Sequence, residues 1–227
     1  MGGFRSIHLS VLAAIVGLAF SAASAQAGDV VADATCCTFA AGPFTQAQGE
    51  TSSLDNQGDA TAFHNVTSTG FGPDREPLFV SETIPGPGRT TIPGTQYLAT
   101  GSYPFVCTLH PGMSGDLEVS AEGTPVARPG VKLTVPAQKL KQVRRSGKLK
   151  VKVTPVAPST GVSVEVRKGA KLIGVIPSLN LTTAAKTVPV KLTKAGRKSI
   201  AKGKKVKVSV ASQVPFGAPA KAARVLR

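Results

Sequence analysis

The charge of this chain changes sign abruptly near residue 124, and this division constrains the fold more than any other feature. Residues 28–124 carry only Arg75 and Arg89 as cations against eleven acidic residues, a net charge of −9. Residues 125–227 carry 24 Lys and Arg residues against Glu165 alone, a net charge of +23. Such a shift, beside a stretch with Pro and Gly, predicts two domains joined by a short linker. We expect one domain over residues 28–122, a linker over 123–130 and a second domain over 131–227.

The first 27 residues have the pattern of an export signal. Arg5 supplies a small basic region, and the apolar stretch 11–20 is too short to span a bilayer comfortably. Small residues follow, with Ala23-Ser24-Ala25 and Ala25-Gln26-Ala27 as cleavage patterns. We expect residues 1–27 to be a signal peptide and the mature protein to be secreted or extracytoplasmic, associated with the cell envelope. An uncleaved N-terminal anchor is the alternative.

Both halves alternate short β-like runs with turn signals. The acidic half has such runs at 44–47, 63–67, 78–84, 96–99, 103–107 and 116–120. In the basic half, residues 148–153 alternate Lys with apolar residues, and 162–166 and 206–210 repeat the period of two. A short helix is expected between Thr193 as its N-cap and Gly203 just past its end. The pattern predicts an all-β protein with two sandwiches, the second immunoglobulin-like with about seven strands.

Residues 101–119 place three metal-binding side chains in a tight loop between two expected strands. The loop carries Cys107, His110 and Met113, which supply a thiolate, an imidazole and a thioether. Two His with one Cys and a weak axial Met make an electron-transfer copper site. His64 is the one further histidine outside the leader, so it completes this set. In the alternative interpretation Cys107 is a buried core thiol and His110 an ordinary loop residue.

The sequence around these residues resembles the cupredoxins, the plastocyanin and amicyanin family of blue copper proteins. The resemblance covers about residues 39–120. It is carried by Gly49-Glu50, Asp55-Asn56, His64-Asn65-Val66 and the run from Tyr103 to Met113. The sequence departs from the family at Ser52, Ser53 and Leu54, where an aromatic or β-branched residue is common.

The resemblance implies a fold and a ligand set. The N-terminal domain would be a Greek-key β-sandwich that holds one copper ion per chain, cycling between Cu1+ and Cu2+. His64, Cys107 and His110 would be equatorial ligands, and Met113 the long axial one. Asn65 would tie the two ligand loops together by hydrogen bonds near Cys107 and Thr108.

The same resemblance implies a carrier of single electrons, and the sequence is a poor match for an enzyme. Outside the leader no histidine beyond His64 and His110 remains for a second copper. The chain has no C-x-x-C-H haem motif and no Gly-rich dinucleotide loop. The imidazole edge of His110 would be the electron port, rimmed by Leu109, Pro111 and Gly112, for brief contact with a redox partner protein. An extracytoplasmic copper-binding or chaperone protein, tethered to the cell envelope, is the alternative.

Three cysteines are an odd number for an exported chain. The adjacent Cys36 and Cys37 have three interpretations: a vicinal disulfide, pairing between chains, or packing as small apolar side chains. Nothing near them in sequence resembles a metal partner, and we favour a structural role.

The Lys-rich second half has three interpretations as well. It is a solvated spacer, or it holds the protein at an anionic cell-envelope polymer or at lipid headgroups, or it binds nucleic acid. Each basic residue near an anionic surface contributes about 1 kcal/mol, which salt screens. Nucleic acid is not expected as a partner, because no aromatic residues interleave with the lysines and the chain is exported.

Overall fold

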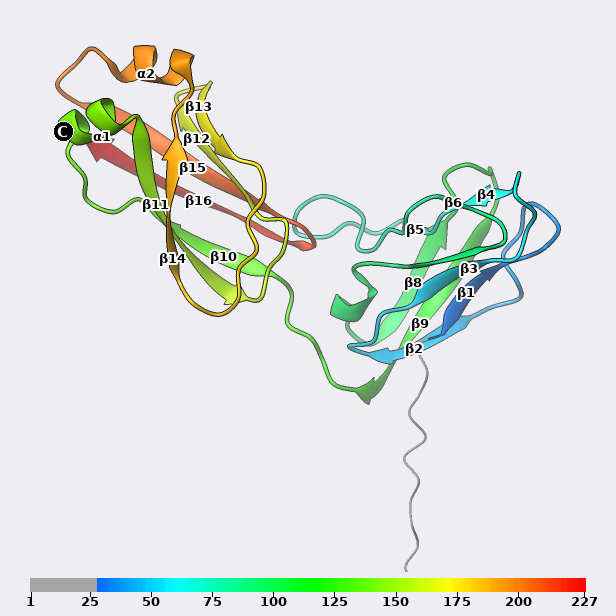
Figure 1. Cartoon of the computed structure of the whole chain (residues 1–227). Coiled ribbons are helices and arrows are strands. Elements are labelled where there is room, and N and C mark those ends of the chain that lie inside the picture. The colour runs from blue at the N-terminus through cyan, green and yellow to red at the C-terminus, as the bar shows by residue number, and fades with distance from the viewer. Residues whose placement is uncertain (1–27) are drawn as a thin grey trace, which may run out of the picture.

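The computed structural model describes residues 28–227, so the expected signal peptide lies outside the described residues. Strands make up nearly all of the regular structure (Figure 1), which confirms the all-β fold class. Between residues 28 and 227 no helix has both the length and the apolar character needed to cross a membrane. Two separate hydrophobic clusters occur, one within residues 30–119 and one within residues 131–226.

The first part of the chain is a β-sandwich. One sheet has the order β2 (Phe44–Gln48), β9 (Ser114–Gly123), β8 (Gly101–Val106) and β5 (Thr67–Ser68). The other has the order β1 (Asp29–Ala32), β3 (Ser53–Asn56) and β7 (Gly88–Thr91), and β4 (Phe63–His64) pairs with β6 (Ile84–Pro85). The β2–β9 and β1–β3 pairs are parallel, and the other pairs are antiparallel.

Aromatic rings fill the first core. Phe105 of β8 is fully buried, and its ring centroid lies 5.1 Å from that of Phe39 and 5.9 Å from that of Phe44. The ring of Phe79 lies 6.4 Å away and is also fully buried. Edge-on and tilted arrangements of this kind add to the energy gained by removing the rings from water. Cys107 follows β8 directly and belongs to the same hydrophobic cluster as Phe105. This core therefore supports the start of the candidate ligand loop.

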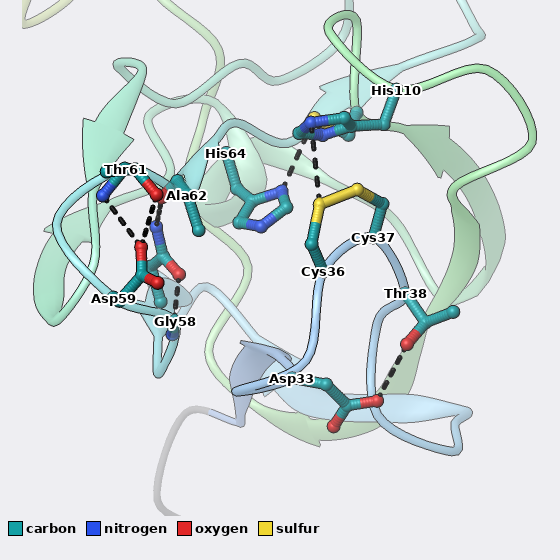
Figure 2. The surroundings of a disulfide bond; sticks show 12 residues. Asp33, Cys36, Cys37, Thr38, Gly58, Asp59, Thr61, Ala62, His64 and His110 are labelled. Carbon is teal, nitrogen blue, oxygen red and sulfur yellow. Dashed lines mark hydrogen bonds between the residues drawn. A yellow bond between two sulfur atoms is a disulfide. The ribbon is translucent and has the colours of Figure 1, made fainter.

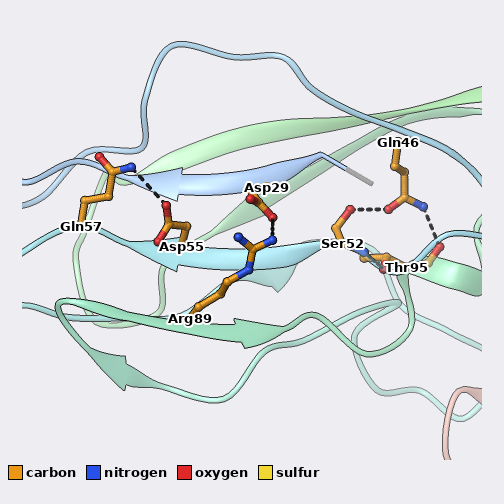
Figure 3. A network of polar contacts seen from close by, with 7 residues as sticks. All are labelled: Asp29, Gln46, Ser52, Asp55, Gln57, Arg89 and Thr95. Atoms are coloured by element: carbon orange, nitrogen blue, oxygen red, sulfur yellow. Dashed lines mark hydrogen bonds and ion pairs between the residues drawn. The ribbon is translucent and has the colours of Figure 1, made fainter. Parts of the chain in front are cut away.

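A buried polar network includes Ser52, one of the three positions at which the sequence departs from the cupredoxin pattern (Figure 3). Ser52 donates its hydroxyl to Gln46 Oε1, and its backbone N–H donates to Thr95 Oγ1 at 3.0 Å. Gln46 Nε2 donates in turn to the carbonyl of Thr95 at 3.0 Å. All three residues are buried, and the network pairs polar groups whose burial alone would cost free energy. The buried polar groups at Ser52 are therefore satisfied by hydrogen bonds within the sandwich.

Two expected strands do not form in the described chain. Within 78–84, Val80 makes one isolated bridge to Thr67, and β6 begins only at Ile84. The 3-10 helix η1 (Thr95–Tyr97) takes the place of the strand expected at 96–99, directly after Gly94 with φ +103°. Strands β1, β3 and β7 were not expected, because their sequences are short and partly polar. Pairing with neighbours decides strand formation in such segments more than intrinsic preference does.

The second part of the chain is a seven-stranded sheet wrapped around its own core. Its order is β13 (Lys171–Ile176), β12 (Ser163–Lys168), β15 (Val206–Val214), β16 (Gly217–Leu226), β10 (Gly130–Thr134), β11 (Lys148–Ala157) and β14 (Lys186–Lys191). Along β11, Leu149, Val151 and Val153 are buried while the lysines between them are exposed. The period-two prediction for this strand is confirmed.

Two short helices accompany these strands. The expected helix is α2 (Lys194–Ile200), and the Thr193 hydroxyl caps it by accepting the N–H of Gly196 at 2.9 Å. The helix α1 (Leu140–Ser146) was not expected, and it ends at Gly147 with φ +63°. A left-handed residue after a helix favours glycine, which explains this end point.

The tip of the β15–β16 hairpin contacts the first sandwich (Figure 1). The backbone N–H of Phe216 donates to Asp74 Oδ2 at 2.7 Å, and the ring of Phe216 lies 6.1 Å from that of Tyr97. Between the two parts, β9 ends at Gly123 and β10 begins at Gly130. The domain limits 28–122, 123–130 and 131–227 remain predictions from the sequence.

Candidate metal site

His64 is held where β4 meets β6. It is the last residue of β4, is fully buried, and pairs with Ile84. The buried Asn56 side chain donates Nδ2 to the carbonyls of Ala62 at 2.7 Å and of Ile84 at 3.1 Å. Its Oδ1 accepts the N–H of Gly58 at 3.1 Å. Asn56 thus fixes the segments on both sides of His64.

The segment from Cys107 to Met113 is a short closed loop between β8 and β9. The N–H of Cys107 donates to the carbonyl of Met113 at 2.9 Å, and the N–H of Met113 donates to the carbonyl of His110 at 3.1 Å. Gly112 has φ +83°, a conformation that glycine adopts at little cost. These bonds turn the chain tightly enough to bring His110 back to Cys107.

Three donor atoms converge at the centre of the site. Cys107 Sγ lies 3.9 Å from Nδ1 of His64 and 3.5 Å from Nδ1 of His110. The two imidazole rings lie 4.7 Å apart, tilted by 50°. All three donor atoms are within 4.8 Å of one another. The tertiary fold therefore brings together one thiol and two imidazoles that the sequence separates by up to 46 positions.

These separations fit a bound metal ion. A first-row metal bonded at about 2.3 Å to sulfur and about 2.0 Å to nitrogen, with about 110–120° between the bonds, holds the donors about 3.5–3.7 Å apart. The observed 3.5 and 3.9 Å are close to this range. Cys107 is a free cysteine and is 4% exposed, so its sulfur is available to a metal but shielded from water.

The electrostatics keep His64 in its metal-binding form. Burial lowers the pKa of His64 below its usual 6.5, and the neighbouring His110 lowers that pKa further. Neutral imidazole is the form that binds metals, and a lowered pKa maintains it near neutral pH. With Nδ1 facing the sulfur, Nε2 is left buried without a hydrogen-bond partner among residues 28–227.

Asn65 connects the two segments that carry the ligands. Its Nδ2 donates to Thr108 Oγ1 at 2.8 Å, and the N–H of Thr108 donates to Asn65 Oδ1 at 2.9 Å. A third bond runs from Asn65 Nδ2 to Thr83 Oγ1 at 3.0 Å. The contact of Thr83 with Asn65 was not predicted, because nothing in the local sequence around Thr83 indicates it.

Met113 is buried, whereas the residues of the expected rim are exposed to solvent. Met113 is 2% exposed and belongs to the same hydrophobic cluster as Cys107. Leu109, Pro111 and Gly112 are exposed, and His110 is half-buried between them and the interior. The loop thus has a buried thioether at its end and an apolar edge facing solvent.

Cys36 and Cys37 form the vicinal disulfide, one of the three interpretations of this pair. The disulfide lies against His110, and this contact was not predicted from the sequence. Cys36 Sγ is 3.8 Å from His110 Nε2, although the two residues are 74 positions apart (Figure 2). The outer edge of the His110 ring, expected to face solvent, is in contact with this disulfide. No local pattern signals the contact, because the fold alone brings the two loops together.

Comparison with known proteins gives weak similarities. No protein-family model matches the chain, and no curated protein matches it. Among solved structures, the chain is similar to an amicyanin mutant in its reduced Cu(I) form at pH 4. The identity is 22%, the match covers 44% of this chain and 90% of that chain, and the TM-score is 0.34. A second amicyanin mutant, in the Cu(I) form, is 20% identical. This match covers 40% of this chain and 82% of that chain, with a TM-score of 0.33.

The chain is also similar to fibronectin(III)-like modules of CbhA from Clostridium thermocellum. The identity is 14%, 80% of this chain and 87% of that chain are covered, and the TM-score is 0.26. Identities and TM-scores as low as these carry no argument about what the chain binds or does.

Proposed function

We propose that the chain binds one copper ion through His64, Cys107 and His110, with Met113 as a weak axial ligand, and carries single electrons outside the cytoplasm. The observation that carries this proposal is the convergence of the Cys107 sulfur and one nitrogen of each imidazole, all within 4.8 Å of one another. Two imidazoles, one thiolate and a weak thioether are the donors of blue-copper electron-transfer sites. Bound copper would supply a one-electron Cu(II)/Cu(I) couple there.

The protein residues hold this donor set in place. Asn56 fixes the strand ends around His64, and Asn65 with Thr108 fixes His64 relative to Cys107. Hydrogen-bonded supports of this kind orient metal ligands and tune the bound ion. Ligands held from several sides move little when an electron arrives, which favours transfer.

The route for the electron would pass through the His110 side of the site. Leu109 is 48% exposed and, with Pro111 and Gly112, supplies an apolar rim for a redox partner protein. Small apolar contacts suit brief complexes that separate quickly. We propose a carrier and not an enzyme, because three strong donors and Met113 would leave no position open for a substrate.

Copper titration of the mature chain tests this proposal. We expect an intense blue absorption with one Cu(II) per chain, and its reversible loss on one-electron reduction. Cys107→Ser removes the sulfur and should abolish the colour, while the matched control Cys36→Ser with Cys37→Ser should keep it. Stoichiometric copper without blue colour in the unmodified chain would refute the assignment.

Copper delivery is the second candidate function, and the contact between His110 and the exposed Cys36 favours it. A cation that enters and leaves on this side would make the chain an extracytoplasmic chaperone tethered to the envelope. A Cu(I) chelator separates the two functions. Removal of the copper within minutes favours the chaperone, and retention through repeated reduction and oxidation favours the carrier.

The lysines of the second sheet support retention at an anionic surface, which we propose as a further role. Lys148, Lys150 and Lys152 are exposed along β11, and Lys148 lies opposite Lys191 of β14. Such a row would bind an anionic polymer or lipid headgroups and release them in salt.

Replacement of three lysines tests this role. We expect two effects of the combined substitutions Lys148→Gln, Lys150→Gln and Lys152→Gln. Binding to vesicles that contain anionic lipid should weaken, and the salt concentration needed to release the protein should fall. The control Lys194→Gln, Lys198→Gln and Lys204→Gln removes the same charge elsewhere and should bind as the parent does. Equal losses in both triple variants would show that net charge alone matters.

A further inference from the structure

His110 has a sulfur atom facing each of its ring nitrogens. Nδ1 lies 3.5 Å from Cys107 Sγ, and Nε2 lies 3.8 Å from Cys36 Sγ. Figure 2 shows the Cys36–Cys37 disulfide directly beside the ring. The ring therefore lies between the buried sulfur of Cys107 and the exposed residue Cys36.

The loop that carries the two cysteines is held firmly in this position. It joins β1 to β2 and is closed by the N–H of Asp33, which donates to the carbonyl of Thr38 at 3.1 Å. Thr38 Oγ1 donates to the Asp33 carboxylate at 2.9 Å, and Ala32 bridges to Phe39. The half-buried Cys37 packs against the first core, while Cys36 is exposed. The loop thus presents Cys36 to solvent beside His110 and keeps Cys37 against the core.

We propose that Cys36, Cys37 and His110 Nε2 form a second metal site, selective for Cu(I), that opens when the disulfide is reduced. One donor atom from each residue lies within 4.8 Å of the others. Soft thiolates with an imidazole favour Cu(I). A cation in solvent can reach the exposed Cys36 directly, whereas Cys107 is buried. The inference stands whether or not copper at Cys107 carries electrons.

The opening step is an ordinary thiol–disulfide exchange. A dithiol reductant supplies two electrons and two protons, its own sulfurs become a disulfide, and the Cys36–Cys37 bond becomes two thiols. Each thiol then releases its proton as its sulfur bonds Cu(I). The exposed Cys36 gives the reductant a sulfur to attack.

The two sites share one imidazole, which links their occupancy. A neutral imidazole has one nitrogen with a free lone pair, since the other carries hydrogen. His110 therefore binds a cation through Nε2 with the exposed pair or through Nδ1 with Cys107, and not through both at once. A cation held by Cys36 and Cys37 binds the other nitrogen of the same ring from the buried site, which makes this pair a loading position.

A full-length Cys107→Ser variant tests the second site, because it removes the thiolate of the first. We would prepare it with the disulfide intact and, without oxygen, with the disulfide reduced and the reductant removed, and compete Cu(I) against a coloured Cu(I) chelator. The reduced form should bind one Cu(I) at least about tenfold more tightly than the disulfide form, and X-ray absorption should show two sulfur ligands and one nitrogen.

Three further variants in this background separate the new site from general thiol binding. Cys36→Ser with Cys37→Ser should remove the gain. His110→Gln should weaken binding by about 10–100-fold. The control Lys194→Gln, in α2 and outside the first sandwich, should leave it unchanged. Cys107→Ala is the second background if the serine variant unfolds. Two outcomes would overturn the proposal: equal affinity of the reduced parent and its His110→Gln variant, or no gain in affinity on reduction. Neither outcome would contradict the blue-copper assignment.

Discussion

Asn65 and Thr108 are joined by two hydrogen bonds that run in opposite directions between the ligand segments. The Asn65 amide donates to the Thr108 hydroxyl at 2.8 Å, and the Thr108 backbone N–H donates to the Asn65 carbonyl oxygen at 2.9 Å. Asn65 follows His64 and Thr108 follows Cys107 directly in the chain. This pair therefore sets the distance between two of the three donor atoms.

Loss of the Asn65 side chain should loosen the site. Asn65→Ala removes the two bonds to Thr108 and the bond to Thr83, and it leaves the Thr108 N–H without its acceptor. We expect this to cost about 1–3 kcal/mol of unfolding free energy. Urea unfolding of the metal-free protein measures this cost. Thr83→Val removes only the outer bond and should cost about 0.5–1.5 kcal/mol. Equal costs for the two variants would contradict a special role of the Asn65–Thr108 pair.

The stability of the metal-free protein should fall in mild acid because of His64. Its pKa is lowered in the folded state by burial and then by His110. As the pH falls below about 6.5, the unfolded chain takes up a proton that the folded chain still excludes, so the unfolding free energy decreases. Urea unfolding at about pH 7.5 and about pH 5.5 measures the decrease. The same slope in His64→Gln would assign the effect to other groups.

Met113 should affect the reduction potential more than the colour. Met113→Leu keeps the buried volume and should cost less than about 1.5 kcal/mol of unfolding free energy. The blue absorption should persist, and the reduction potential should rise, because loss of an axial donor destabilises Cu(II) more than Cu(I). Voltammetry of the copper-loaded protein measures the shift. An unchanged potential would show that Met113 acts as a core residue alone.

Phe105 should be essential to the first sandwich. It is fully buried and packs against Phe39, Phe44 and Phe79, so Phe105→Ala should cost about 3–5 kcal/mol. Thermal unfolding of the metal-free protein measures the loss. Phe71→Ala is the control, because Phe71 is 72% exposed and its removal should change the unfolding free energy by less than about 0.5 kcal/mol.

The parts of this fold that were predictable are those where the local pattern is strong. The alternation of Lys and apolar residues identified β11, and Thr193 identified the start of α2. The segments 78–84 and 96–99 have apolar residues that suit a strand, but their neighbours pair elsewhere. Residues 53–56 form β3 because β1 and β7 flank them, which no local pattern shows.

The sequence by itself determined the candidate ligands, since so few residues of the right chemistry exist. Cys107, His110 and Met113 lie within seven positions, and His64 is the one further histidine outside residues 1–27. Only the tertiary structure decided that both Nδ1 atoms face one sulfur, that Thr83 supports Asn65, and that Cys36 lies against His110. The physical reason is that spacing along the chain limits contacts within a loop, whereas contacts between loops depend on how two sheets pack.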